Sequence, residues 1–217
     1  MKKDIDLRRD VDDELEWEPS VDAAQIGVAA HDGVVTLTGS VRSYSEKLAA
    51  ERVAKRVGGV KAIANDIEVR LTGKAERTDS EIARAAVDAL KWRTTVPEGC
   101  IKVSVTKGWV TLEGEVDRQY QRDAAFDVVH HLRGVKGVIS LIALKPHVSP
   151  TEVTSRIEAA FRRSAELDAH KIRVETQDGK VTLRGDLQSW WERDEAERTA
   201  WAALGVTEVE NLIAVNP

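Results

Sequence analysis

Histidines are the residues of this sequence best suited to proton transfer or metal binding. His130 and His131 are adjacent in a predicted helix, where neighbouring side chains point about 100° apart, so we do not expect the pair to share a metal ion. His31, His147 and His170 have no Cys, Asp or Glu at metal-ligand spacing on a predicted common face. The sequence therefore predicts no metal site.

The single cysteine and the crowded carboxylates do not form a recognisable catalytic set. Cys100 is the only cysteine, which excludes an internal disulfide, and a nucleophilic role would need a base held beside it. Acidic side chains crowd residues 10–18, where they indicate a solvated and mildly self-repelling helix face. We expect no catalytic residue and no enzyme activity, an enzyme being the most remote alternative.

The charge pattern limits the classes of partner. Lys and Arg are interspersed with acidic residues along all 217 positions, and the net charge is -5, whereas a nucleic-acid backbone requires a concentrated cationic face. No run of about 18 apolar residues is present, so we expect no transmembrane segment. Residues 1–21 carry frequent charges where a signal peptide would be apolar. We expect a cytoplasmic protein with no nucleic-acid partner.

The helices and strands that position these side chains can be predicted from an internal repeat. In three places a Gly-x-Val-Thr-Leu-x-Gly segment is followed, twenty residues after its second glycine, by a Gly-Val step. Chance does not produce this spacing three times, so the chain contains three copies of one unit. We expect the recurring glycines to determine the fold at turns and close contacts, and they are Gly33, Gly39, Gly59, Gly108, Gly114, Gly134, Gly179, Gly185 and Gly205.

Each copy shows the same order of periodicities. An amphipathic helix, as at residues 82–90, precedes an alternating strand, a turn such as Asp32-Gly33 and the Val-Thr-Leu strand. The period then changes to 3.6, and Ser43 with Glu46 has the form of a capping box. The third glycine ends that helix, and a last strand follows.

This order predicts an α+β fold of three tandem αββαβ modules. Strand, helix and strand in succession predict a parallel crossover, so each module is expected to be a three-stranded mixed sheet with two helices on one face. The predicted modules are residues 1–73, 77–146 and 148–217, joined by short polar linkers.

The repeated unit resembles the BON domain, a module named for bacterial osmotically inducible and nodulation proteins. The resemblance rests on Gly-x-Val-Thr-Leu-x-Gly-x-Val, the alanine-bearing helix and the final Gly-Val-x-x-Val-x-Asn, and it covers essentially the whole chain. Asn65 and Asn211 match the final asparagine, whereas Ser140 departs from it. The resemblance implies a stress-associated protein, with binding of anionic phospholipid or of potassium attributed to some members.

Two patterns predict how the modules meet. The last strands of copies two and three are apolar on both faces, as at Ile139, Leu141 and Leu212, so we expect part of each open sheet face to be buried between modules in one compact body. Aromatic residues recur at equivalent positions, which favours packing in cores or between modules over exposed rings that touch a lipid or a partner. These aromatic residues are Trp17, Tyr44, Trp92, Tyr120, Trp190 and Trp191.

These features favour a non-enzymatic binding protein. The middle copy, the only one that is not acidic, is the first place to look for a surface that binds anionic phospholipid or a protein partner. The alternative is a cytoplasmic potassium-binding protein, with the ion held by backbone carbonyls and carboxylates and no other cofactor. The ligand, the active module and the oligomeric state stay open. The predicted ligand or partner residues are Lys102, Lys107, Trp109, Tyr120, Trp190 and Trp191.

Overall fold

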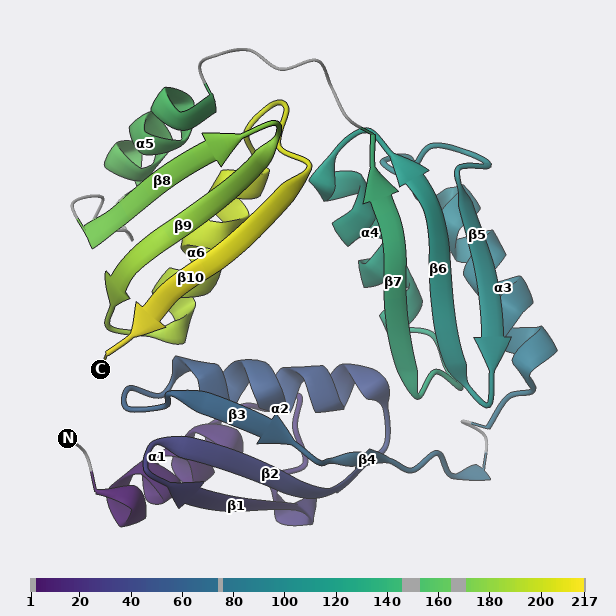
Figure 1. Ribbon diagram of the computed structural model, residues 1–217. Helices are drawn as coiled ribbons and strands as arrows, with labels where there is room; N and C mark the ends of the chain where they lie inside the picture. The colour runs from purple at the N-terminus through teal and green to yellow at the C-terminus, as the bar shows by residue number, and fades with distance from the viewer. Residues whose placement is uncertain (1–2, 74–75, 146–152, 165–170, 217) are drawn as a thin grey trace.

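The computed structural model describes residues 3–73, 76–145, 153–164, 171–216 and shows three similar units in sequence (Figure 1). The first contains α1 (Asp4–Trp17), the short 3-10 helix η1 (Ala23–Gln25), β1 (Ile26–His31), β2 (Val34–Val41), α2 (Tyr44–Arg56), β3 (Ala62–Asn65) and β4 (Glu68–Val69). The second contains α3 (Asp79–Trp92), β5 (Ile101–Thr106), β6 (Trp109–Val116), α4 (Gln119–His130) and β7 (Gly137–Leu144). The third contains α5 (Val153–Arg163), β8 (Ile172–Gln177), β9 (Lys180–Leu187), α6 (Trp190–Trp201) and β10 (Glu208–Val215).

Every module has the predicted mixed sheet. The Val-Thr-Leu strand lies in the middle, antiparallel to the strand before it and parallel to the strand after the long helix. Both helices of a module cover the same face of its sheet (Figure 1). The predicted fold class, three tandem αββαβ modules, is confirmed. The last strand of the first module is split into β3 and β4, whereas β7 and β10 are continuous.

Alternation in the middle strand produces a separate core in each module. In β6, Val110 and Leu112 are fully buried while Thr111 between them is partly exposed, as expected for side chains that alternate between faces. Helix α3 adds Ile82, Ala86 and Leu90 to this core. The equivalent helix α1, whose hydrophobic pattern is weaker, still buries three residues at this spacing, Leu7, Val11 and Leu15.

The hairpin turns require backbone conformations with positive φ. Lys107 and Gly108 have φ of 53° and 81°, and the corresponding Asp-Gly pairs of the other modules adopt the same two-residue geometry, which is that of a type I′ turn. The turn amides of the middle module donate to the helix that precedes the sheet. Asp79, the first residue of α3, accepts hydrogen bonds from the Lys107 and Gly108 amides, both at 2.8 Å.

Replacing Asp79 with alanine is expected to destabilise the middle module by about 1–2 kcal/mol, because two charge-assisted hydrogen bonds and a favourable charge at a helix N-terminus are lost together. Thermal unfolding measures the effect. Asp88→Ala, at an exposed position of the same helix, is the control. Equal midpoints for the two variants would show that the turn contact does not contribute.

The family asparagine connects the last strand to the long helix in two modules. Asn211 Nδ2 donates to Glu197 Oε2 at 3.0 Å, and Asn65 Nδ2 donates to Glu51 Oε2 at the same distance. In the middle module the corresponding positions hold Ser140 and Phe126. The middle module therefore has an aromatic ring on α4 in place of the glutamate that accepts this hydrogen bond in the other two modules.

The prediction that the open sheet faces are buried between modules is wrong. Ile139 and Leu141 of β7 are 45% and 59% exposed, and Leu212 of β10 is 45% exposed. The reason is that the modules meet through the ends of their long helices, so the sheet faces are left uncovered. In the view of Figure 1 the sheets of the second and third modules turn this open face toward the reader.

The packing role predicted for Trp17 and Trp92 is also wrong. Both side chains are almost fully exposed, at 83% and 85%. Each stands two positions after a buried leucine, Leu15 or Leu90, and two positions turn a helix by about 200°. The rings therefore point away from the core at the C-terminal ends of α1 and α3.

Candidate functional site

The three long helices meet head to tail (Figure 1). Among the described residues, the C-terminal end of α4 contacts the N-terminal end of α2, the end of α2 contacts the start of α6, and the end of α6 contacts the start of α4. The contacting positions are equivalent in the repeat, since Lys55, His130 and Trp201 all stand four residues before the third glycine of their copy. Three heterologous contacts of one kind thus close a ring of modules.

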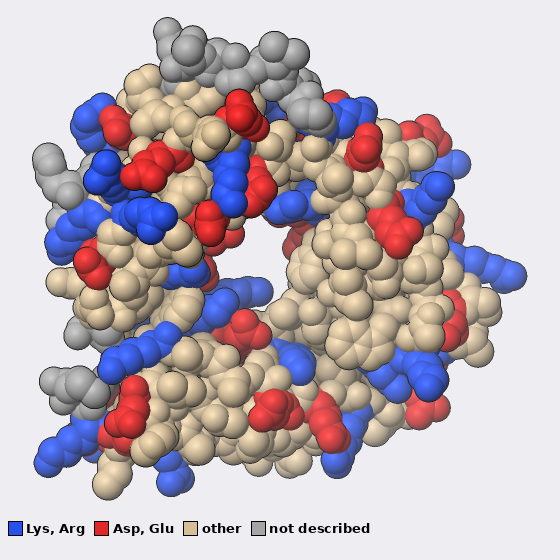
Figure 2. All heavy atoms as spheres, viewed as in Figure 1, with Lys and Arg blue, Asp and Glu red and all other residues tan. Residues whose placement is uncertain are grey.

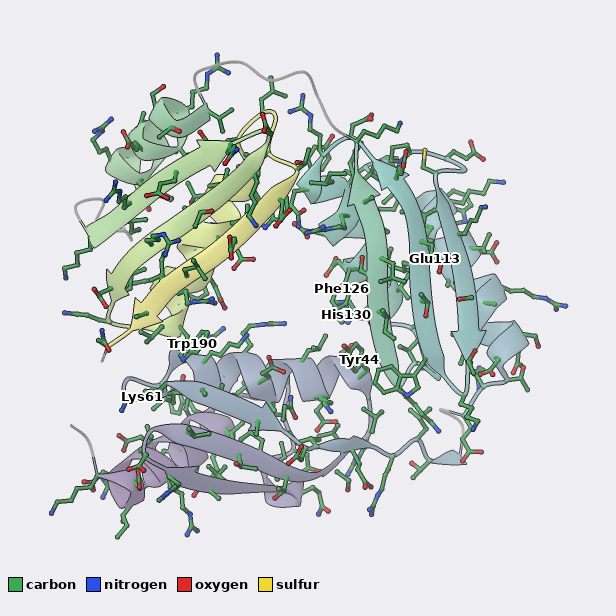
Figure 3. The ribbon with its side chains drawn as sticks, viewed as in Figure 1. Tyr44, Lys61, Glu113, Phe126, His130 and Trp190 are labelled. Carbon is green, nitrogen blue, oxygen red and sulfur yellow. The ribbon has the colours of Figure 1, made fainter. Side chains whose placement is uncertain are left out.

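At two of these junctions an aromatic ring crosses from one module to the core of another. Tyr44 of the first module packs against the core of the second, and Trp190 of the third packs against the core of the first. Figure 3 shows both rings at opposite ends of α2. Burial raises the pKa of the Tyr44 hydroxyl, and a backbone hydrogen bond with Val138 acts in the opposite direction. The predicted packing role is therefore found at these two positions.

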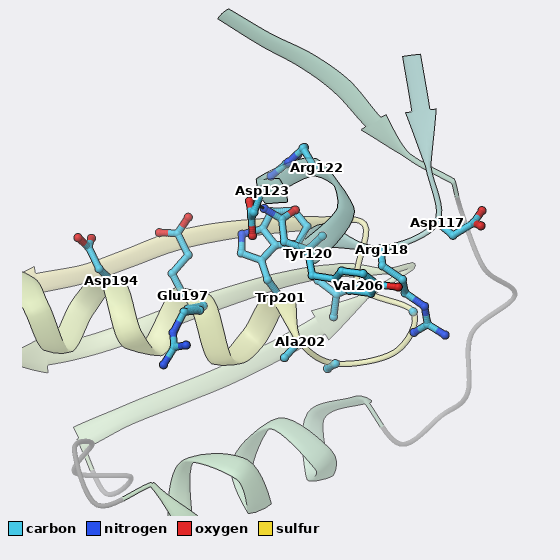
Figure 4. A pocket seen from close by; sticks show the side chains of 14 residues that line it. Asp117, Arg118, Tyr120, Arg122, Asp123, Asp194, Glu197, Trp201, Ala202 and Val206 are labelled. Carbon is cyan, nitrogen blue, oxygen red and sulfur yellow. Dashed lines mark hydrogen bonds between the residues drawn. The ribbon is translucent and has the colours of Figure 1, made fainter. Parts of the chain in front are cut away.

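The third junction contains a cavity of about 790 Å³ between α4 and α6 (Figure 4). Arg122 lies over the Trp201 ring at 4.8 Å from its centroid. Gln119 Nε2 donates to Asp123 Oδ1 at 2.8 Å. The side-chain oxygen of Gln119, Oε1, is buried and has no hydrogen-bond partner among the described residues. The lining also includes Asp194, so it combines carboxylates, guanidinium groups and aromatic rings.

Desolvation at this junction shifts three charged groups toward their neutral forms. Burial raises the pKa of Asp123, with a smaller opposing effect of Arg122, whose own pKa burial lowers. Burial likewise raises the pKa of Asp194, with Lys55 opposing it from 4.0 Å. Because burial is the leading cause in each case, these shifts report the packing of modules rather than a pair of carboxyl groups tuned for acid and base roles.

The predicted ligand residues do not come together. Lys102 is exposed on the open sheet face, and Trp109, 50% exposed, covers Gly137 on that same face. Lys107 is the first residue of the hairpin turn. Tyr120 lines the cavity of the third junction and is 58% exposed.

The two tryptophans predicted in the third module also separate. Trp190 packs on the first module, while Trp191 is 49% exposed. The six residues thus lie on five different parts of the molecule. Sequence position alone could not show this, because side chains at neighbouring positions of a strand or helix point in different directions.

The open faces of the second and third modules differ in charge. In the third module Lys180 pairs with Glu208 at 2.9 Å and with Glu210 at 3.1 Å. The corresponding positions of the middle module are Trp109, Gly137 and Ile139. Figure 2 shows charged side chains crowding the third module and a broad area without them on the second.

The end of α3 is a surface that sequence reasoning assigned to packing. Trp92 stands between Lys91 and Arg93, all exposed. Val87, 53% exposed, and Arg84 lie on the outer side of the same helix. The sequence signal was available in the Lys-Trp-Arg triplet at the end of the amphipathic pattern, two positions beyond its last apolar residue.

The described part of the chain also holds two groups of histidine and aspartate that bear on the predicted absence of a metal site. Asp127, His130 and His131 each offer a ligand atom within 4.8 Å of the others, as do Asp4, His31 and Asp32. His131 follows the end of α4, and its ring lies 3.9 Å from that of His130. The adjacent histidines thus lie closer together than their sequence positions indicate, and the absence of a metal site stays a prediction. His147 and His170 lie outside the described residues.

No helix in the described ranges is both long and apolar enough to cross a bilayer. A potassium ion held by backbone carbonyls has no residues assigned to it by the sequence, and it stays a prediction.

Comparison with known proteins places the whole chain in a family context. The family model for the BON domain matches residues 3–70, 78–146 and 149–217. Osmotically-inducible protein Y of Escherichia coli (strain K12) is 35% identical over 128 residues, 55% of this chain and 61% of that protein. The 21 kDa hemolysin of Actinobacillus pleuropneumoniae is 32% identical over 121 residues, 55% of this chain and 62% of that protein.

The chain thus spans about three fifths of the length of these two relatives. The C-terminal domain of CdsD, a structural protein of the type III secretion system of Chlamydia trachomatis, aligns over both full chains with 14% identity and a TM-score of 0.27. A similarity that low supports no conclusion.

Proposed function

The chain belongs to the BON domain family, and we propose that it is a non-enzymatic, stress-associated binding protein whose middle module attaches to anionic phospholipid surfaces. The observation that carries the proposal is the end of α3, where Trp92 is 85% exposed between Lys91 and Arg93. An exposed indole of this size has no role in the core of its own module.

The chemistry of this helix end suits a bilayer interface. Tryptophan is favoured at the level of the lipid headgroups, where its ring is apolar and its N–H can reach a polar partner. A cationic side chain near an anionic membrane gains about 1 kcal/mol. Lys91 and Arg93 flank Trp92, and Arg84 adds a third positive charge on the exposed side of α3. The opposing charges are Asp88 on the same helix and Asp127, 3.8 Å from Arg93.

Two other exposed surfaces match the proposal less well. Trp17, the equivalent ring of the first module, stands between Glu16 and Glu18, which an anionic surface would repel. The open sheet face of the middle module carries Glu113 (Figure 3), in register with Lys102 across the hairpin. Of these three surfaces, the end of α3 is the most cationic.

The names of the relatives are in keeping with this proposal. One is named for osmotic induction and another as a hemolysin, a name that denotes lysis of a cell enclosed by a membrane. The matched regions cover only part of those proteins, so the membrane test below is made on this chain itself.

We expect the intact chain to float with vesicles containing phosphatidylglycerol and not with vesicles of phosphatidylcholine alone. Trp92→Ser is expected to weaken binding about tenfold, equivalent to 1.4 kcal/mol. Replacing both Lys91 and Arg93 with Glu is expected to abolish it, because attraction becomes repulsion. About 0.5 M salt should release the wild-type protein, since it screens exposed charges beyond a few ångströms.

Trp17→Ser is the matched control, because it removes an equally exposed ring from the equivalent helix of an acidic module. Equal loss of binding in the Trp17 and Trp92 variants would show that α3 is not the contact. Absence of flotation with anionic vesicles at low salt would contradict the proposed phospholipid binding itself.

A further inference from the structure

The end of α4 brings together three potential metal ligands. Asp127, His130 and His131 stand at spacing i, i+3 and i+4, and His131, the residue after α4, keeps helical backbone angles, so the three lie on one side. One ligand atom from each lies within 4.8 Å of the other two. His131 Nε2 is 3.9 Å from Asp127 Oδ1, so small side-chain rotations bring the set to the separations of a coordinated ion.

Both histidines are held in the tautomer that a metal requires. His130 Nδ1 lies 3.2 Å from the Phe126 carbonyl oxygen, so Nδ1–H donates and Nε2 keeps its lone pair. Ser45 Oγ lies 3.0 Å from the His130 carbonyl oxygen and 3.0 Å from His131 Nδ1. Because the hydroxyl donates its single proton to the carbonyl, it accepts from His131 Nδ1–H, and the His131 Nε2 is also left with a lone pair. Oxygen partners of this kind orient the histidines of metal sites.

The residues around the cluster determine its affinity for a metal ion. His130 is 7% exposed and stacks on Phe126 with ring centroids 5.2 Å apart. Figure 3 labels both residues beside β7. Arg93 lies 3.8 Å from Asp127 Oδ2, leaving Oδ1 on the histidine side, and Arg52 acts on His130 electrostatically. Two nearby cations oppose a bound cation, so we expect moderate affinity, with water completing an open coordination shell.

The cluster is built only in the middle module among the three equivalent places. The positions of Asp127, His130 and His131 hold Arg52, Lys55 and Arg56 in the first module, and Arg198, Trp201 and Ala202 in the third. The scaffold of the repeat therefore does not account for these three side chains. Phe126, which orients His130, is itself the residue that replaces the glutamate paired with the family asparagine elsewhere.

We propose that Asp127, His130 and His131 bind a divalent transition-metal ion, and that the ion strengthens the junction between the first two modules through Ser45. Two imidazoles and one carboxylate suit zinc, nickel or cobalt and disfavour magnesium, calcium and potassium, which prefer oxygen ligands. The coupling follows because Ser45 belongs to α2 and holds both the ligand His131 and the backbone of the ligand His130. The ligand residues differ from those of the proposed lipid surface, and the two sites adjoin at Arg93, which lies 3.8 Å from Asp127 Oδ2.

Isothermal titration of the whole chain, prepared without a histidine tag, with zinc, nickel and magnesium chlorides tests the proposal. We expect one site for zinc and for nickel and none for magnesium. His131→Gln and Asp127→Asn, both at exposed positions, are each expected to weaken zinc binding at least about tenfold. Circular dichroism of each variant establishes that it is folded.

His31→Gln is the control, because it removes an exposed histidine of the other His-Asp group and leaves the α4 cluster intact. It should leave the titration unchanged. The proposal is overturned if wild-type protein binds no zinc at millimolar concentration, if the two α4 variants bind as well as wild type, or if His31→Gln removes the site. Ser45→Ala tests the coupling, since it should lower the zinc-induced rise in melting temperature while all three ligands remain. An unchanged rise would overturn that part.

Discussion

Gly114→Ala is expected to unfold the middle module at temperatures where the other two stay folded. Gly114 has φ of 145°, and a Cβ built on it would overlap the carbonyl oxygen of Cys100, the residue just before β5. The backbone conformation and the overlap together should reduce the free energy of unfolding by about 3 kcal/mol. For a unit of this size such a loss lowers the melting temperature by roughly 10 °C or more.

Differential scanning calorimetry is the measurement, because three separate cores allow the affected module to melt first. Gly99→Ala in the same module is the control. Gly99 also has positive φ, 74°, but no atom lies within 4 Å of a built Cβ, so only the backbone cost of about 1 kcal/mol is expected. Indistinguishable melting of the two variants would mean that the strand accommodates the methyl group and that close approach is not why glycine stands there.

Trp190→Ala is expected to release the third module from the first. The ring packs against the core of the first module, and Arg193 lies over it at 5.0 Å from the ring centroid. The junction also has the 4.0 Å pair of Lys55 with Asp194, which is weak because both groups are partly solvated. Loss of a half-buried indole should reduce the free energy of association between the two modules by about 2 kcal/mol, less than for a fully buried ring. Most of the contact at the junction should be lost with it.

Small-angle X-ray scattering measures this effect as an increase in the radius of gyration, with each module still folded by circular dichroism. Trp191→Ala is the matched control, since its ring is the adjacent one on α6 and is 49% exposed. It should leave the scattering unchanged. An unchanged radius for Trp190→Ala would show that the ring of modules does not depend on this side chain.

Sequence reasoning predicted the scaffold well because local chemistry repeats. Gly108 and its equivalents are needed where the chain takes positive φ, and this requirement can be read at one position without knowledge of the rest of the fold. Alternation at Val110 and Leu112 likewise predicts which side is buried. Such signals depend on neighbours two to four residues away, and all three copies carry them.

The surroundings of the aromatic rings and of the histidine pair could not be predicted, for a physical reason. Recurrence favours packing, yet Trp92 recurs and is exposed, while Trp190 recurs and packs against another module. What distinguishes them is the position of each ring relative to a helix end and to a different module. Neighbouring helix positions point about 100° apart, whereas the rings of His130 and His131 lie 3.9 Å apart at the end of α4.

The amino-acid sequence by itself determines that the chain is three αββαβ modules, because turn glycines, strand alternation and helix caps act locally. It also shows Lys and Arg interspersed with acidic residues, which predicts no concentrated cationic face. Only the tertiary structure decides that α2, α4 and α6 meet end to end, that the sheet faces stay open, and that Ser45 reaches two histidines more than eighty positions away. These contacts depend on how separate modules sit against each other, and the spacing of residues along one chain carries no record of that.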